Sequence, residues 1–165
     1  MIELLVFDVD GCLTNGGISY GNSDHEEFKT FHVKDGFGIV SWMKLGKKSA
    51  IITGRHSRVV ERRAKELGIN YLYQDVKNKK AVLEEILLKE GLKFENVAAI
   101  GDDLNDLALL RCVGLSFCPK DAVLLVQKEV DVILSKEGGN AAVREMIDNV
   151  VEKENMSEAF VNLWL

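Results

Sequence analysis

Short apolar runs alternate along the chain with stretches in which apolar residues recur three and four positions apart. The short runs are typical of strands buried on both faces of a parallel sheet, and we expect them over 3–7, 49–53, 71–73, 97–101, 114–117 and 130–133. The helical spacing predicts helices over 36–45, 57–67, 79–90, 105–111, 122–126 and 140–152. This order predicts an α/β fold with a doubly wound, Rossmann-like parallel sheet.

Two segments depart from this alternation. Residues 16–33 carry short alternating runs on either side of a Gly-Asn-Ser-Asp turn, which predicts a β-hairpin after the first strand. The hairpin is too short to be a separate domain, so we expect a single domain over 1–165. The tail, 154–165, carries Phe160, Trp164 and Leu165 beyond the last helix, and such apolar residues need a partner surface on the same body or on a neighbouring subunit.

Composition narrows the class of protein. A net charge of −5 without a basic stripe argues against nucleic acid as a partner. The three cysteines lack paired metal-ligand spacing and are expected to be reduced thiols. The start of the chain has no basic segment, and no apolar run approaches the roughly 18 residues of a membrane span. We therefore expect a cytoplasmic protein that does not enter membranes.

Polar side chains follow several of the predicted strands. They are Asp8 and Asp10 after the first strand, Thr53 after the second, Lys79 at the start of a helix, and Asp102, Asp103 and Asp106 in the motif GDDLND. Because the carboxyl ends of parallel strands meet at one edge of the sheet, we expect these side chains to converge on one crevice. Each motif alone is also typical of a turn or a helix cap, but their joint order favours an active site.

This inventory fits magnesium-assisted phosphoryl transfer. A cage of carboxylate oxygens suits Mg²⁺. A carboxylate such as Asp8 can attack phosphorus and form an aspartyl-phosphate. Lys79 and the Thr53 hydroxyl can contact the phosphoryl oxygens, while Asp10 protonates the leaving alcohol and then activates water.

The order DxDGxxT, TGR, Lys and GDDxND resembles the haloacid dehalogenase superfamily of phosphohydrolases over almost the whole chain. The resemblance implies that Asp8 is the nucleophile and Asp10 the general acid and base, which also offers its main-chain carbonyl to Mg²⁺. It implies that Thr53 and Lys79 bind the phosphoryl group and that Asp102 is a further metal ligand. Asp103 and Asp106 would then belong to the metal surroundings or orient the lysine.

The absence of a large cap domain, together with the runs FHVKDGFGI and GGNAAVREMID, resembles the capless 3-deoxy-D-manno-octulosonate 8-phosphate phosphatases. The resemblance implies hydrolysis of that sugar-acid phosphate on the way to lipopolysaccharide. It also implies a homotetramer in which a neighbour's hairpin and tail help to cover each site. A phosphatase for a nine-carbon, sialic-type sugar-acid phosphate is the alternative within the enzymes, and a catalytically idle regulatory relative is the alternative outside them.

The substrate-binding residues are predicted from their position. Lys34, Asp35 and Gly36 lie where the hairpin returns to the body, and Arg55 can bind an anionic group of the substrate. One residue departs from the family pattern GGxGAxRE, because Ala141 stands where a glycine is expected. A methyl group is tolerable there if the residue is helical.

Overall fold

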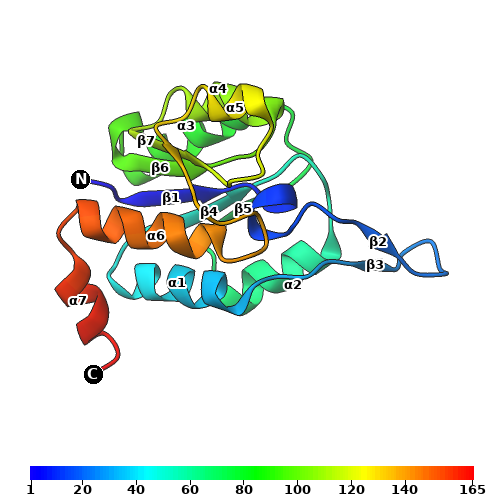
Figure 1. The fold of residues 1–165 in the computed structure, drawn as a ribbon, viewed down its shortest axis with the longest axis horizontal. Helices are drawn as coiled ribbons and strands as arrows, with labels where there is room; N and C mark the ends of the chain where they lie inside the picture. Colours follow the sequence, from blue (N-terminus) through cyan, green and yellow to red (C-terminus); the bar gives the residue numbers. More distant parts are fainter.

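A computed structural model of the chain describes residues 1–165 and shows a six-stranded sheet between two layers of helices (Figure 1). Every pair of neighbouring strands in this sheet is parallel, in the order β5-β4-β1-β6-β7-β8. The strands are β1 (Leu4–Phe7), β4 (Lys48–Ile52), β5 (Tyr71–Tyr73), β6 (Val97–Ile100), β7 (Leu115–Cys118) and β8 (Val132–Ile133). This confirms the predicted doubly wound sheet and each of its strands to within two residues at either end.

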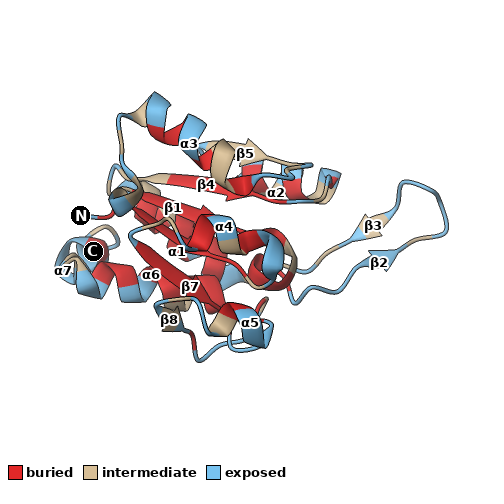
Figure 2. Ribbon diagram, turned by 90° about the horizontal axis from the view of Figure 1, so that it is seen from above, coloured by how far each residue is buried: buried red, intermediate tan, exposed pale blue.

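The helices cover both faces of the sheet because its strands are apolar on both sides. On β1, Leu5 and Phe7 enter one core, whereas Leu4 and Val6 enter the other. The first core is closed by α1 (Val33–Lys44), α2 (Arg58–Leu67) and α6 (Ala142–Lys153). The second core is closed by α3 (Lys79–Glu90), α4 (Leu107–Leu110) and α5 (Leu124–Gln127). Buried residues accordingly concentrate in the central strands and the helix faces that cover them (Figure 2).

Several predicted helix ends differ from the structure. The predicted helix over 36–45 begins three residues earlier, at Val33, so that the glycines near its start lie inside the helix. The predicted helix over 105–111 is a 3₁₀ turn (Leu104–Asp106) followed by the short α4, and the one over 122–126 begins later, at Leu124. A further 3₁₀ turn, Phe94–Asn96, precedes β6. None of the helices is both long and apolar enough to cross a bilayer.

The predicted hairpin is present and stands away from the body of the molecule (Figures 1 and 2). Its strands, β2 (Ser19–Tyr20) and β3 (Glu27–Phe28), pair antiparallel. The side chains of Tyr20 and Phe28 are 71% and 60% exposed. The hairpin therefore carries apolar surface that this chain leaves uncovered.

The tail packs on its own chain. It forms a short helix that the sequence pattern did not predict, α7 (Ser157–Asn162), whose Phe160 is buried against the first core. The indole of Trp164 lies 4.5 Å from the ring of Phe37, and its N–H donates to Ser41 Oγ at 3.1 Å. Phe160 and Trp164 therefore have contacts on the same body, whereas Leu165 is 97% exposed and finds no such surface.

Candidate active site

The carboxyl end of β1 places the first two acids of the site. Asp8 follows the last residue of β1, and the chain then makes a tight turn over Val9–Leu13 in which Asp10 and Gly11 have non-helical backbone angles. Within this turn Gly11 has a φ of +92°, and a Cβ there would lie 2.0 Å from Asp102 Oδ2. Only glycine both adopts this conformation without strain and leaves room for the neighbouring carboxylate.

A second glycine supports this turn from the late motif. A Cβ on Gly138 would lie 1.8 Å from the carbonyl oxygen of Gly11, and the N–H of Gly139 donates to Cys12 O at 3.0 Å. The Thr14 hydroxyl closes the turn from inside, because it donates to Val9 O at 3.3 Å. Gly138 and Gly139, which precede α6, therefore pack against the loop that carries Asp8 and Asp10.

Lys79 lies at the centre of a buried ion-pair cluster. Its Nζ lies 2.6 Å from Asp8 Oδ1 and 2.6 Å from Asp106 Oδ1, and its side chain is 2% exposed. The other oxygen of Asp106 accepts the main-chain N–H of Asp102 at 3.0 Å and that of Asp103 at 3.3 Å. Asp106 thus connects the lysine to the loop after β6, whereas Asp103 accepts from Leu104 N–H at 2.7 Å and caps the 3₁₀ turn.

Burial and like charges act together on the acids. Burial raises the pKa of Asp8 to about 7, and the charge of Asp106 adds to this effect while Lys79 opposes it. Burial likewise raises the pKa of Asp102 to about 8, with further contributions from Asp8, Asp106 and Asp103. Burial alone would lower the pKa of Lys79, but the two carboxylates outweigh it and raise the pKa. The lysine is therefore charged, and the carboxylates hold more negative charge than it can balance.

A polar pocket opens above this cluster. No hydrophobic residue lines it, and its lining residues are Asp8, Asp10, Thr53, Gly54, Arg55, Asp102, Asp103 and Asn105. The structure therefore brings together the predicted residues from β1, β4 and β6, with Lys79 buried beneath Asp8. Arg55 enters from the loop after β4, where its Nη2 donates to Glu27 Oε1 at 3.1 Å. Its Nη1 is buried and has no partner in the chain.

The other predicted substrate residues lie away from this pocket. Lys34 is exposed on the first turn of α1, and Gly36 packs against the Arg63 side chain. Asp35 is buried, and its Oδ1 accepts the main-chain N–H of Arg144 from α6 at 2.8 Å. Asp35 therefore joins α1 to α6 within this chain, and a contact of these residues with substrate stays a prediction.

Ala141 is not helical. It has a φ of +68° and a ψ of +25°, in the left-handed region, and it directly precedes α6. The condition under which a methyl group was expected to be tolerable is therefore not met.

Sequence reasoning missed some residues of this region. Asn105 lines the pocket from within the motif GDDLND, where only the acids were assigned. Glu27 and Lys29 come from the hairpin and contact Arg55 and Asp10 respectively. Sequence reasoning could have found Glu27 and Lys29 from their spacing, because side chains two positions apart in an extended segment point to the same side.

This fold is that of a haloacid dehalogenase-like hydrolase, and the model of that family matches residues 38–114. The 3-deoxy-D-manno-octulosonate 8-phosphate phosphatase of Escherichia coli K12 is 44% identical over 147 residues, which cover 89% of this chain and 78% of the relative. The chain belongs to the family of these phosphatases.

Two solved structures of relatives have the same fold. The Moraxella catarrhalis phosphatase, in complex with a magnesium ion, a phosphate ion and a KDO molecule, matches with a TM-score of 0.94 and 39% identity, covering 99% of this chain and 94% of that chain. The cobalt-bound Haemophilus influenzae enzyme matches with a TM-score of 0.91 and 36% identity, covering 97% and 93%.

Proposed function

We propose that this protein hydrolyses 3-deoxy-D-manno-octulosonate 8-phosphate to the free sugar acid and inorganic phosphate. The observation that carries the proposal is the charged Lys79 held between Asp8 and Asp106 beside Asp102, at the carboxyl edge of the sheet. The name and bound ligands of the relatives support the choice of sugar acid. A nucleophile and lysine in direct contact also favour an active enzyme over an idle relative.

The reaction runs in two displacements at phosphorus, with an aspartyl-phosphate on Asp8 between them. A carboxylate oxygen of Asp8 attacks phosphorus, the bond from phosphorus to the sugar oxygen breaks, and Asp10 donates a proton to that oxygen. Asp10 then takes a proton from water, and the resulting hydroxide attacks the phosphorus of the aspartyl-phosphate. The bond between phosphorus and the Asp8 oxygen breaks, which releases phosphate and restores the carboxylate.

Lys79 and Thr53 hold the group that is transferred. Lys79 remains charged because two carboxylates contact it, so it can neutralise negative charge on the phosphoryl oxygens. Asp106 positions this lysine, because its Oδ1 accepts a hydrogen bond from Lys79 Nζ at 2.6 Å. Thr53 lines the same pocket and offers its hydroxyl as a further donor.

The residues of the pocket fit Mg²⁺. Burial raises the pKa of Asp8 and of Asp102, and the single charge of Lys79 balances only part of the negative charge of the neighbouring carboxylates, so a divalent cation would stabilise their ionised forms. Gly11, which has no Cβ, leaves room for the Asp102 carboxylate beside the turn. The carboxylates of Asp8 and Asp102 and the main-chain carbonyl of Asp10 are the proposed ligands, with Asp103 nearby. When bound, the ion supplies positive charge against the phosphoryl oxygens and allows Asp8 to approach them as an anion.

Arg55 is the proposed contact for the sugar end of the substrate. Its Nη1 has no partner, and the guanidinium suits a carboxylate or hydroxyl group. Lys34, Asp35 and Gly36 belong to the proposal as substrate-side residues of an assembled enzyme, since they lie outside the pocket of one chain. A phosphorylated sugar acid is charged and does not cross membranes, which favours the cytoplasm as the place of reaction.

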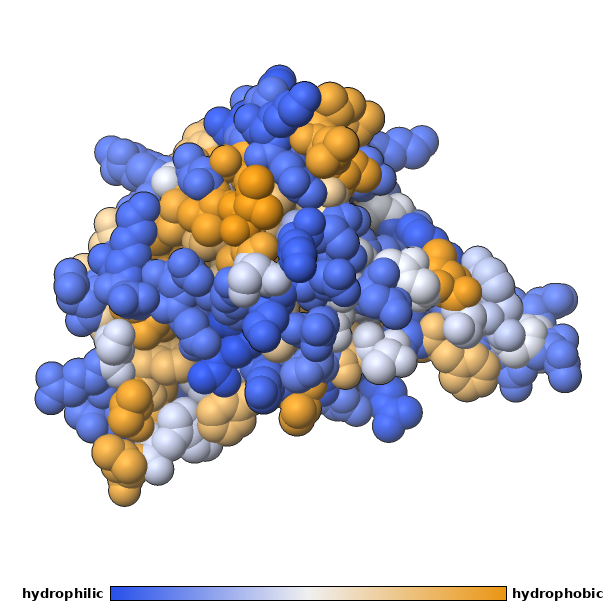
Figure 3. Space-filling view, viewed as in Figure 1, coloured by the Kyte–Doolittle hydropathy of each residue, from blue (hydrophilic) through white to orange (hydrophobic).

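A homotetramer with shared sites is also part of the proposal. The projecting hairpin carries hydrophobic residues on its surface (Figure 3), and its exposed Ile18, Tyr20 and Phe28 would be covered by a neighbouring subunit. Light scattering after size exclusion tests this assembly, with Tyr20→Ser/Phe28→Ser as the variant expected to weaken it. A native protein that elutes as a monomer at micromolar concentration would contradict it.

The test of activity is a panel of phosphomonoesters with Mg²⁺. The eight-carbon substrate is expected to have the highest kcat/KM, above the nine-carbon sugar-acid 9-phosphates and simple hexose phosphates. A nine-carbon substrate in first place would replace the proposed substrate but keep the chemistry. Equal turnover of all compounds would contradict a dedicated sugar-acid phosphatase.

A further inference from the structure

A buried lysine from the hairpin contacts the general acid of the site. The side chain of Lys29 is 0% exposed, and its Nζ forms a close ion pair with Asp10 Oδ1. The second oxygen of Asp10 has no partner within the chain, and Asp10 lines the pocket while Lys29 does not. One carboxylate oxygen of Asp10 is therefore bound by Lys29 of the hairpin, and the other is free to contact the reacting groups.

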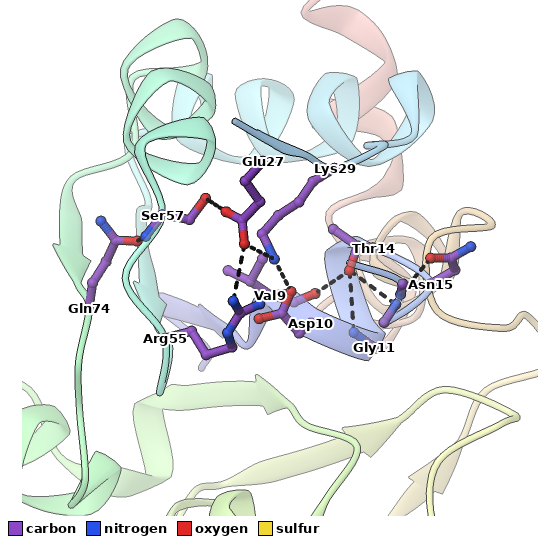
Figure 4. A network of polar contacts seen from close by, with 12 residues as sticks. Val9, Asp10, Gly11, Thr14, Asn15, Glu27, Lys29, Arg55, Ser57 and Gln74 are labelled. Atoms are coloured by element: carbon purple, nitrogen blue, oxygen red, sulfur yellow. Dashed lines mark hydrogen bonds and ion pairs between the residues drawn. The ribbon is translucent and has the colours of Figure 1, made fainter. Parts of the chain in front are cut away.

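Lys29 is itself held in place by the loop after β4. Glu27 and Lys29 lie two positions apart and point to the same side, where Glu27 Oε1 is 4.0 Å from the lysine Nζ. The carboxylate of Glu27 accepts from Ser57 Oγ at 2.6 Å and from Arg55 Nη2 at 3.1 Å (Figure 4). The base of the hairpin is thus fastened on one side to Asp10 and on the other to Arg55 and Ser57.

Two simpler roles for Lys29 fit these contacts less well. A substrate ligand would line the pocket, and the ammonium of Lys29 is instead covered and directed at Asp10. A purely stabilising ion pair would not need to use a carboxylate that faces the reacting groups. Buried pairs give little net stability, because desolvation offsets their attraction.

We propose that Lys29 is a positioning residue, which fixes the carboxylate of Asp10 so that its free oxygen meets the leaving oxygen and then the attacking water. The inference rests on the proposed role of Asp10 in phosphate-ester hydrolysis. It makes the hairpin of each subunit part of that subunit's own catalytic machinery. Small misplacements of a catalytic group lower rates by up to about a hundredfold, which sets the scale of the effect.

A double-mutant cycle tests the proposal. Lys29→Met is expected to lower kcat about 10- to 100-fold with KM changed less than about twofold, because the chemical step is affected and substrate binding is not. Lys29→Arg, which restores a positive charge and donors, is expected to be faster than Lys29→Met. Adding Lys29→Met to Asp10→Asn should have no further effect, since a residue that acts through Asp10 has nothing left to position.

The controls separate this inference from the proposed substrate. Lys128→Met removes an exposed lysine that is in no ion pair and is expected to leave kcat unchanged. The cycle is measured on p-nitrophenyl phosphate as well as on the sugar phosphate, so a wrong sugar leaves the result for Lys29 intact. Equal losses from Lys29→Met with and without Asp10→Asn, or a raised KM at native kcat, would overturn the positioning role.

Discussion

Replacing Ala141 by glycine is expected to stabilise the protein. Ala141 has a φ of +68° directly before α6, and this left-handed conformation costs a residue with a Cβ about 1–2 kcal/mol. Glycine removes that strain, but its greater freedom in the unfolded chain lowers the free energy of unfolding by about 0.4–1 kcal/mol. Loss of a half-buried methyl group lowers it by roughly 0.4 kcal/mol more. The net gain in the free energy of unfolding is about 0.5 kcal/mol, or an increase in Tm of roughly 1–2 °C for a chain of this size.

Two control variants make the sign of this change decisive. Ala142 is the first residue of α6 and is completely buried, so Ala142→Gly loses helix propensity and core packing. It is expected to lower the free energy of unfolding by about 1–2 kcal/mol. Asn155 has a φ of +56°, which asparagine tolerates, so Asn155→Gly should change stability little.

The assay is differential scanning calorimetry of the three variants and the native protein at one protein concentration. Ala141→Gly is expected to have the highest Tm and a native kcat, since the residue lies outside the pocket. If Ala141→Gly has a lower Tm than the native protein while Ala142→Gly behaves as expected, the reasoning from backbone strain is wrong. The cause would then be the methyl group's own packing.

Three further predictions concern the acids. Asp8→Asn is expected to lower kcat at least about a thousandfold with an unchanged circular dichroism spectrum. Mg²⁺-dependent turnover near the native rate would rule out Asp8 as the nucleophile. Burial raises the pKa of Asp35 from 3.8 to about 6. The free energy of unfolding therefore falls by about 3 kcal/mol as pH rises from about 4 to about 6, because this carboxyl ionises more readily in the unfolded chain than in the folded protein. Chemical denaturation should show Asp35→Asn gaining about 1 kcal/mol more at pH 7.5 than at pH 5, and a pH-independent difference would refute this. Mg²⁺ at about a hundredfold above its Kd should stabilise the native protein against unfolding by roughly 2.7 kcal/mol, and Asp102→Asn should lose most of that gain in thermal scans with and without EDTA.

The strands were predictable because each is a short run rich in apolar residues. Burial on both faces of the sheet requires such runs; β1 is followed directly by Asp8, and β6 by Gly101 and then Asp102. The start of α3 at Lys79 was predicted from the helical spacing, and the structure confirms it, with the Asn78 side chain accepting from Ala81 N–H at 3.1 Å.

The early start of α1 could not be read locally. Gly36 is a poor helix former, but in the structure it lies inside the helix where a Cβ would be 2.4 Å from Arg63 Nη2. At this position the glycine lies against the end of the Arg63 side chain of α2. The helix begins where the His32 side chain accepts the Lys34 N–H at 3.2 Å, and histidine is not among the residues typical of a helix cap.

The sequence by itself determined the order of the elements and the chemical types of the site residues, because both depend on local spacing and on where apolar runs stop. It also determined that Asp8, Thr53 and Asp102 meet, since the ends of parallel strands share an edge. Only the tertiary structure decided which groups touch. Lys79 contacts Asp106 as well as Asp8, Lys29 reaches Asp10 from the hairpin, and Trp164 lies on its own α1. These contacts join side chains far apart in the sequence, and their geometry depends on packing that no local pattern encodes.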